Sequence, residues 1–569
     1  MSSSRTIVRF GEFELDQDAK ELRRKGSKIR LQDQPLQILQ ILLEQPGKLV
    51  PREELQRRIW PSDTFVDFDH GINNAIKRLR EALGDTAESP RYIETQPRRG
   101  YRFLNGVATT SPEISIAVLP FLSLSADPEN EIFADGMSEE IISSLAQIKN
   151  LHVTARTSSF SFKGKHVDLR IIGEQLNVRT VLEGSVRKSG NRLRITAQLV
   201  NAADGYHLWS ETYDREMKDV FAIQEEIAKS IAKRLEVTLD SKQQPLFGAG
   251  TDNVEAFKFY TQGRSLFFQR GMRLIPSVEY FNKAVALDPK YGLAWSGLAD
   301  AYNMVAFYGL AKPDACLPLA KEAAQQAIAL DPLLAEAHTS LAMSFLLSDW
   351  DRSSAEREFL RSMELKPRNS SARIWYGTFC LYWVAGRFEE AIAETKEAVR
   401  IDPLSAYARA MQSFTYLPVD VDRSLATALE TLQIEPNHFL GHWAHLQALN
   451  LQGRFGEASE VGELALKVSG RSGWMLASLA RTYAAMGKRA DSEALYMELR
   501  WRSKREYVAP AVLAYAAYAA GEQDQAIRYG EEAHAIGDPS LIAAKYWPDF
   551  ADLRKDSRFE EILISRGWK

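Results

Sequence analysis

A recurring tripeptide constrains the fold of this 569-residue chain more than any other feature. In it an aliphatic residue and a polar residue precede a proline, and successive prolines are 43, 35, 36 and 33 residues apart. Proline cannot continue a helix, so each tripeptide indicates a helix end. A chain built from such repeats buries the apolar face of each repeat against its neighbours. The tripeptides are Leu287-Asp288-Pro289, Leu330-Asp331-Pro332, Leu365-Lys366-Pro367, Ile401-Asp402-Pro403 and Ile434-Glu435-Pro436.

The pattern inside these repeats predicts two helices in each. An interval of about 34 residues is typical of tetratricopeptide repeats. Small residues recur where two helices would approach closely, and large apolar residues recur on the first helix. We therefore predict an all-α tetratricopeptide superhelix over residues 251–569, with about eight repeats. The residues with this spacing include Trp295, Leu298, Ala299, Tyr302, Ala355, Ala391, Ala458 and Ala526.

The first 105 residues are more basic than the rest of the chain. They hold 19 Lys and Arg against 16 Asp and Glu, whereas the whole chain has a net charge of −4. A helix is predicted over residues 69–83, with Gly84 as its terminator. One face would be buried and would carry Ile72, Ile76, Leu79 and Leu83. The other would carry His70, Asn74, Lys77 and Glu81, flanked by Asn73, Arg78 and Arg80.

That polar face has two interpretations. It is either a solvated basic surface or a face that enters a DNA major groove, where Lys and Arg pair with guanine and Asn with adenine. A hairpin predicted directly afterwards favours DNA. Residues 92–95 and 101–103 can pair as strands, with Arg98 and Arg99 at the tip beside Gly100. Arginines at such a tip suit phosphates or a minor groove.

Residues 5–105 resemble the winged helix-turn-helix DNA-binding domain of OmpR/PhoB-type response regulators, especially the CadC-like branch. In that family the third helix enters the major groove and the wing touches the adjacent backbone or minor groove. The resemblance implies DNA contacts for Asn73, Asn74, Lys77, Arg78, Arg98 and Arg99, with Arg80 as an alternative brace of the fold. The matching segments are Val50-Pro51-Arg52-Glu53-Glu54-Leu55, Ile59-Trp60, Ile76-Lys77-Arg78-Leu79-Arg80, Leu83, Tyr92-Ile93-Glu94-Thr95 and Arg99-Gly100-Tyr101-Arg102.

The N-terminal domain is expected to span residues 1–106. Strands are predicted near residues 7–10, 13–15 and 29–31, and helices from Pro35 and from Pro51. Residues 108–113 are predicted to be a linker. Neither a receiver domain before this module nor a transmembrane helix after it is predicted, so phosphorelay and periplasmic sensing are not expected.

Residues 114–240 predict an α/β domain with mixed strand pairing. Apolar strands are expected at residues 114–121 and 151–155, followed by three strands at 180–186, 192–199 and 205–212. Helices are expected at 137–148, 169–176 and 220–239. The domain resembles the TolB-like domain found beside tetratricopeptide repeats, which implies no established chemistry. Asp135, Glu183 and Trp209 are therefore interpreted as structural. The resemblance rests on Ile116-Ala117-Val118-Leu119-Pro120-Phe121, Phe133-Ala134-Asp135-Gly136, Val181-Leu182-Glu183-Gly184-Ser185-Val186-Arg187 and Leu208-Trp209-Ser210.

No catalytic motif is present in the sequence: a Walker loop, a GxGxxG after a strand, a nucleophile elbow and HExxH are all missing. Cys316 and Cys380 form no CxxC pair, which argues against a disulfide framework or a zinc site. His438, His442 and His445 have a spacing that metals can use. In repeat register His442 and His445 fall at packing positions, so we interpret the group as packing residues rather than as a metal site. We predict no catalysis, no cofactor and no metal.

The sequence thus predicts a multidomain, cytoplasmic, bacterial transcriptional regulator. Its partners would be double-stranded DNA, which it would bind as a homodimer, and a protein or peptide in the groove of the superhelix. Tyr376, Tyr382 and Trp383 are expected on that groove, or else buried between helices. Two alternatives remain. One is a scaffold whose winged helix contacts proteins, and the other is an enzyme-like middle domain that responds to a nucleotide.

Overall fold

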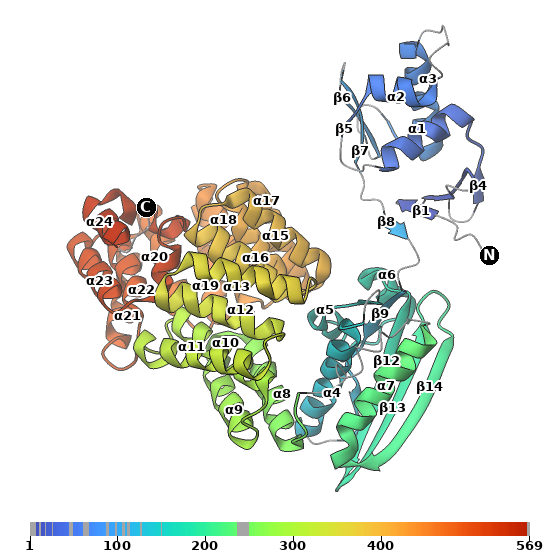
Figure 1. Ribbon diagram of the computed structural model, residues 1–569. Helices are drawn as coiled ribbons and strands as arrows, with labels where there is room; N and C mark the ends of the chain where they lie inside the picture. Colours follow the sequence, from blue (N-terminus) through green and yellow to red (C-terminus); the bar gives the residue numbers. More distant parts are fainter. Residues whose placement is uncertain are drawn as a thin grey trace. The chain divides into compact units, whose positions relative to one another are not determined.

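The computed structural model describes residues 7–10, 13–16, 19–24, 27–44, 49–60, 68–86, 90, 92–96, 99–104, 108–110, 114–125, 128–148, 151–235 and 250–565. The chain divides into two compact units, Met1–Glu113 and Ile114–Lys569. The first unit is a small α+β domain. The second joins a mixed-sheet domain to an all-α array of helix pairs (Figure 1).

The described residues of the first unit form two sheets and three helices. An antiparallel sheet has the strand order β4-β3-β2-β1-β8, and a three-stranded sheet has the order β5-β7-β6. The elements are β1 (Ile7–Phe10), β2 (Phe13–Asp16), β3 (Glu21–Arg24), β4 (Ser27–Ile29), α1 (Asp33–Glu44), β5 (Leu49–Pro51), α2 (Arg52–Ile59), α3 (Phe68–Leu83), β6 (Ile93–Gln96), β7 (Gly100–Phe103) and β8 (Ala108–Thr110).

One aromatic cluster joins the two sheets of this unit. Phe10 and Phe13 come from the first sheet, Phe103 from the second, and Tyr92 directly precedes β6. Their ring centroids lie 5.2 to 6.2 Å apart, within the range of favourable aromatic contacts. All four side chains are at most 2% exposed. The N-terminal sheet and the hairpin are therefore held in a single core.

The structure corrects the predicted outline of this unit in three places. Strand β3 was not predicted, and it pairs with both β2 and β4. Strand β5 was not predicted either, and it pairs with β7. Ala108–Thr110, assigned to the linker, form β8 and pair with β1 in the opposite direction. This short segment lacks the alternation of apolar and polar residues that predicts a strand. It joins the edge of the sheet through backbone pairing alone. The predicted helices and the hairpin after α3 are present.

The middle domain, residues 114–235, has a mixed sheet in the order β11-β9-β12-β13-β14, with β10 beside β12. β9 pairs in parallel with β11 and β12, whereas β13 pairs antiparallel with β12 and β14. The predicted mixed pairing is confirmed. The elements are β9 (Ile114–Val118), β10 (Leu122–Ser123), α4 (Pro128–Ala146), β11 (Leu151–Val153), α5 (Arg156–Phe160), α6 (Leu169–Leu176), β12 (Thr180–Ser189), β13 (Arg192–Asn201), β14 (His207–Glu216), η1 (Met217–Asp219) and α7 (Val220–Arg234).

Helices cover both faces of this sheet, as the apolar runs of its strands require. Ile116 and Val118 of β9 pack with residues of α4 and α7, while Ala117 between them packs with Ile172 and Leu176 of α6. Successive side chains of a strand point to opposite faces of the sheet, so the apolar residues of one strand contribute to the cores on both faces. The short helix α5 was not predicted.

The C-terminal array contains eight successive helix pairs among the described residues, from α8–α9 to α22–α23. Five second helices end at the aliphatic residue of a tripeptide, at Leu287, Leu330, Leu365, Ile401 and Ile434. No described helix is long and apolar enough to cross a membrane. The helices are α8 (Val254–Gln269), η3 (Gly271–Arg273), α9 (Leu274–Leu287), α10 (Gly292–Phe307), α11 (Pro313–Leu330), α12 (Ala335–Ser344), η4 (Phe345–Asp349), α13 (Arg352–Leu365), α14 (Ser370–Trp375), η5 (Tyr376–Val384), α15 (Phe388–Ile401), α16 (Ala406–Tyr416), α17 (Val421–Ile434), α18 (Phe439–Leu451), α19 (Phe455–Val468), α20 (Gly473–Ala485), α21 (Arg489–Arg502), α22 (Pro510–Ala519) and α23 (Gln523–Ala535).

The expectation that Tyr376, Tyr382 and Trp383 line an open groove is wrong. Each of the three is at most 5% exposed. They lie on η5, a π-helical stretch that continues α14, and Trp383 stacks on Phe307 with ring centroids 5.6 Å apart. The alternative interpretation, burial between helices, is confirmed.

The last segment of the chain folds back into the array. It comprises η6 (Pro539–Ala543), η7 (Pro548–Phe550), η8 (Leu553–Lys555) and α24 (Ser557–Ser565). The Trp547 ring lies 5.7, 5.1 and 5.3 Å from those of Trp383, Phe414 and Trp443. These three rings belong to different repeats. The returning segment is therefore part of the core of the superhelix.

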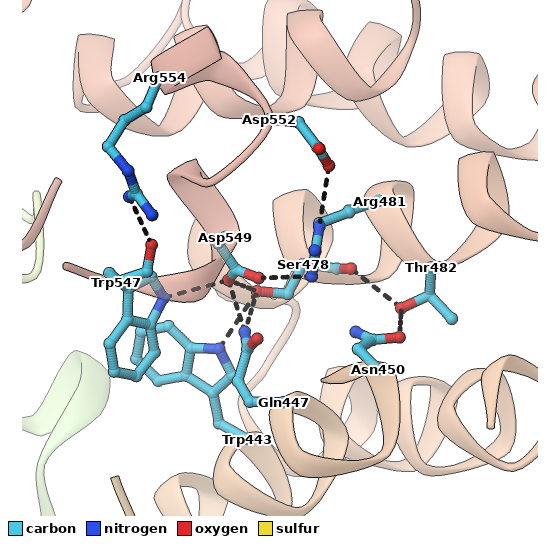
Figure 2. A network of polar contacts seen from close by, with 10 residues as sticks. All are labelled: Trp443, Gln447, Asn450, Ser478, Arg481, Thr482, Trp547, Asp549, Asp552 and Arg554. Atoms are coloured by element: carbon cyan, nitrogen blue, oxygen red, sulfur yellow. Dashed lines mark hydrogen bonds and ion pairs between the residues drawn. The ribbon is translucent and has the colours of Figure 1, made fainter. Parts of the chain in front are cut away.

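A buried carboxylate anchors the same segment (Figure 2). Asp549 is 1% exposed, and its Oδ2 accepts hydrogen bonds from Gln447 Nε2 at 2.5 Å, Ser478 Oγ at 2.8 Å and Trp547 Nε1 at 3.2 Å. Arg481 Nη1 lies 3.6 Å from the other carboxylate oxygen. A buried charge needs such partners to be tolerated.

The middle domain is attached to the superhelix by polar contacts as well. Glu139 of α4 forms ion pairs with Arg156 of α5 at 2.9 Å and with Arg264 of α8 at 2.5 Å. Asp402, just before α16, accepts hydrogen bonds from the Ser158 backbone N–H at 3.0 Å and its hydroxyl at 2.5 Å. These contacts are consistent with the division of the chain, in which the middle domain and the array form one compact unit.

Candidate nucleic-acid interface

Helix α3 presents the two faces that its sequence predicts. Ile72, Ile76, Leu79 and Leu83 are at most 3% exposed and form part of the core of the first unit. Asn73, Asn74, Lys77 and Arg78 are exposed. Among the described residues, no hydrogen bond or ion pair engages the side chains of Asn74 and Lys77. These two polar groups are therefore available to a ligand in the way that major-groove recognition requires.

Asn73 has a different environment from Asn74. Its Oδ1 accepts hydrogen bonds from Tyr101 Oη at 2.8 Å and from Arg52 Nη2 at 3.0 Å. Arg52 also donates to Tyr101 Oη at 2.8 Å. These residues belong to α3, β7 and the start of α2, so one small network ties the helix to the hairpin strand. Bidentate pairing with adenine needs the amide oxygen as well as the nitrogen. With its oxygen occupied, Asn73 offers a ligand its Nδ2 group only.

Two arginines of α3 also have protein partners. Arg78 donates to Gln32 Oε1 in the segment before α1. Arg80 Nη2 donates to the Ile93 carbonyl at 2.6 Å and to Thr95 Oγ1 at 2.9 Å, both on β6. The bracing role considered for Arg80 is thereby supported. Arg78 stays exposed, so a DNA contact by this residue remains a prediction.

The hairpin is built from β6 and β7 in antiparallel register, with Glu94 opposite Arg102 and an ion pair between them at 3.4 Å. Arg99 lies exposed in the turn, and its carbonyl accepts a hydrogen bond from the Arg52 N–H at 3.3 Å. Arg98 lies outside the described residues. Gly100 is required by space, because a Cβ there would lie 2.0 Å from the Val50 carbonyl oxygen.

Asp85 is a positioning residue that the sequence reasoning missed. Helix α3 ends in a Schellman motif, in which Gly84 donates to the Glu81 carbonyl and Asp85 to the Arg80 carbonyl. The Asp85 carboxylate then accepts from the backbone N–H groups of Tyr92 at 3.1 Å and Ile93 at 2.8 Å. This buried side chain fixes where β6 begins. An aspartate directly after a helix-terminating glycine was the available signal.

Comparison with known proteins agrees with this geometry. Residues 26–103 match the family model for the C-terminal domain of transcriptional regulatory proteins. Residues 26–103 form a DNA-binding domain of the OmpR/PhoB type. Residues 112–230 match a second family, the second domain of HilA/YgeH-like transcriptional regulators. A TolB-like domain was predicted for that region, and the family matched there is the HilA/YgeH-like one.

Similar proteins cover different shares of the chain. The putative adenylate cyclase 3 of Rhizobium meliloti (strain 1021) is 33% identical over 303 residues, which are 52% of this chain and 50% of that protein. The transcriptional regulator HilA of Salmonella typhi is 24% identical over 459 residues, 76% of this chain and 77% of HilA. The chain thus spans half the length of the first relative and about three quarters of the second.

A solved structure is similar to part of this chain. The Klebsiella pneumoniae RstA DNA-binding domain in complex with the RstA box is 26% identical. The match covers 17% of this chain and 96% of that one, with a TM-score of 0.16.

Three of the other polar residues singled out in the sequence, Asp135, His438 and His442, have local partners. In the middle domain, Lys163 Nζ lies 2.6 Å from an Asp135 carboxylate oxygen. In α18, His442 Nε2 lies 2.9 Å from the Pro436 carbonyl, and His438 Nδ1 accepts from the Gly441 N–H. Burial lowers the pKa values of His438 and His445 to about 4. The packing interpretation accounts for His442 and His445, and the described residues contain no cluster of His, Cys, Asp and Glu suited to a metal.

Proposed function

We propose that this protein is a transcriptional regulator that recognises a specific DNA sequence through Asn74 and Lys77 of α3. Supporting the proposal is the hydrogen bond between Asn73 and Tyr101, which places strand β7 beside the exposed face of the helix. A helix face with free amide and ammonium groups next to a hairpin can occupy a major groove while the hairpin follows the adjacent backbone. Asn74 would pair with adenine, and Lys77 with guanine acceptors.

The remaining predicted contacts would position the domain. Arg99 in the turn, together with Arg98, would meet phosphates or a minor groove. Arg78 would reach a phosphate at the edge of the groove, and Asn73 would brace the hairpin and donate through Nδ2. Phosphate contacts supply much of the affinity but no sequence information. One winged helix reads a short site, so we expect two copies of the regulator on one DNA target.

The test is selection of genomic fragments by the full chain, followed by titration of the recovered duplex and of random duplex at two salt concentrations. Recovery of a shared motif, bound with higher affinity than random DNA, is the expected result. Equal affinity for both duplexes at both salt concentrations would contradict sequence-specific recognition. Binding to proteins but not to DNA would favour the scaffold alternative.

We also propose that the superhelix receives the signal, in the form of a protein or peptide. Support comes from its eight helix pairs and from its attachment to the middle domain through Asp402 and Arg264. A TolB-like origin of the middle domain would fit such a connecting role. Removing residues 251–569 should leave DNA binding intact and abolish the response of a reporter gene in cells. A truncated chain that still responds would place sensing in the middle domain.

A further inference from the structure

The second unit contains a cavity of about 870 Å³ where α5 of the middle domain meets the superhelix. Such a volume is typical of small-molecule sites. Its walls come from one middle-domain helix and from several repeats, and many of the lining side chains are aromatic. The lining residues on which the proposal below rests are Arg156, Arg270, Tyr407, His438, Phe439 and Trp474.

Arg270 is the unusual member of this lining. The residue is only 6% exposed, and its guanidinium lies over the rings of Phe267 at 4.1 Å and Tyr407 at 4.6 Å. Its Nη1 is buried without a hydrogen-bond partner, and no described carboxylate forms an ion pair with it. By contrast, Arg156 and Arg264 share the carboxylate of Glu139. A buried charge without a counter-charge is costly, and ring faces compensate it only in part.

The backbone at Arg270 is strained as well. Helix α8 ends there with φ 59° and ψ −167°, a region populated almost only by glycine. The next residue is Gly271, which could have adopted that conformation without cost. Strain of this kind persists where the surrounding structure enforces it, and it gathers at ligand clamps. Here its effect is to hold the guanidinium in the wall of the cavity.

The charges around the cavity favour a monoanion over a more highly charged ligand. Asp402 is committed to Ser158, and Glu506 is paired with Arg502 at 2.5 Å. Glu435 adds a further acid to the lining, and Arg273 adds an exposed cation. A second negative charge on the ligand would face these acids, whereas one carboxylate would neutralise Arg270. A carboxylate also matches the planar fork of a guanidinium.

His438 can supply a neighbouring donor. Its Nδ1 accepts the Gly441 N–H at 3.2 Å, so the proton of the neutral ring must lie on Nε2. Burial is the main cause that lowers the pKa of His438 to about 4, and the charge of Arg270 is the next. The ring is therefore neutral near pH 7 and offers one N–H group rather than a second charge.

We propose that this cavity binds a small organic monocarboxylate whose carboxylate pairs with Arg270 and whose apolar body lies among Tyr407, Phe439 and Trp474. The ligand would join α5 to the repeats, because Arg156 and Thr157 line the same cavity. It would thus act on the connection between the middle domain and the superhelix. The binding site itself does not depend on the proposed DNA recognition, since both can be measured separately on the full chain.

The test is calorimetric titration and thermal denaturation of the full chain with 3-phenylpropanoate, indole-3-acetate and octanoate. Their neutral amides and inorganic phosphate are the comparison probes. At least one carboxylate should bind saturably and raise Tm, while its amide should bind at least tenfold more weakly. Binding by none of the carboxylates, or equal binding of acid and amide, would overturn the proposal. Tighter binding of phosphate would overturn the choice of a monocarboxylate.

Variants locate the binding site. Arg270→Gln should weaken carboxylate binding at least tenfold. Arg505→Gln is the matched control, because Arg505 stacks on Trp501 at 3.7 Å but does not line the cavity. If Arg270→Gln does not fold, His438→Asn retains an acceptor that can cap α18 and removes the ring donor. It should weaken binding severalfold with little change of Tm. Unchanged affinity in the folded variants would overturn the assignment.

Discussion

The Tyr101 hydroxyl donates a hydrogen bond to Asn73 Oδ1 over 2.8 Å, and through it the hairpin strand β7 is held against helix α3. The two residues are 28 positions apart in sequence. Arg52 bonds to both, so the start of α2 takes part in the same network. The relative position of the helix and the hairpin is therefore set by side chains as well as by the core. DNA binding should depend on this network even where its members touch no DNA.

The first prediction concerns Tyr101→Phe. The ring stays in the core, but Asn73 and Arg52 lose a partner, which should cost roughly 0.5–1.5 kcal/mol of stability. Because the hairpin is then less well positioned, we expect DNA affinity to fall severalfold on specific and random duplex alike. Titration of both duplexes and thermal denaturation measure these effects. A loss confined to one base position would instead indicate that the network reads sequence directly.

The second prediction concerns the exposed face of α3. Asn74→Ala or Lys77→Ala should cost about 1–3 kcal/mol on the selected DNA site and much less on random duplex. Glu81→Ala serves as a control, since Glu81 is exposed on the same helix and its removal takes away a negative charge. Equal losses on the two kinds of DNA would assign Asn74 and Lys77 to the DNA backbone.

Periodicity made the faces of α3 predictable, because the spacing of Ile72, Ile76, Leu79 and Leu83 places all four on one side of an α-helix. It could not reveal that Asn73 and Arg78 have partners, because Tyr101 and Gln32 approach them only in the folded domain. Local pattern also failed for β8, which is defined by pairing with β1.

In the superhelix too, local sequence predicted some features, whereas others depend on contacts between distant segments. The tripeptides located the helix ends, because a proline prevents the helix just before it in sequence from continuing. The burial of Trp383 was left open, because Trp547, which covers it, comes from a segment outside the repeat pattern. The strained Arg270 has no sequence signal beyond its neighbour Gly271.

The third prediction concerns the tip of the hairpin. Replacing Arg98 and Arg99 with alanine should weaken binding nearly uniformly across DNA sequences, because a hairpin tip meets the backbone rather than base edges. The slope of log affinity against log salt should fall by about one for each phosphate that the variant no longer binds. Titrations at several salt concentrations give this slope. An unchanged slope would remove both arginines from the interface.

The fourth prediction concerns pH. Burial, followed by the neighbouring charge of Glu139, raises the pKa of Glu140 from 4.5 to about 8. Between these values the folded chain holds a proton that the unfolded chain has released, so the free energy of unfolding falls as the pH rises. The slope contributed by this group is at most about 1.4 kcal/mol per pH unit. Glu140→Gln should flatten the profile of Tm between pH 5 and 8, whereas Glu174→Gln, at an exposed position, should not.

The fifth prediction concerns the anchor in Figure 2, where Asp549 accepts hydrogen bonds from three side chains. Asp549→Ala leaves Gln447, Ser478 and Trp547 without this buried acceptor, and a broken buried network of this kind typically costs about 3–5 kcal/mol. Asp552→Ala is the matched control, because Asp552 lies 3.8 Å from Arg481 but has a 45% exposed side chain. It should cost less than about 1 kcal/mol. Denaturant unfolding followed by tryptophan fluorescence would compare the two, and similar losses would show that the returning C-terminal segment is not anchored through Asp549.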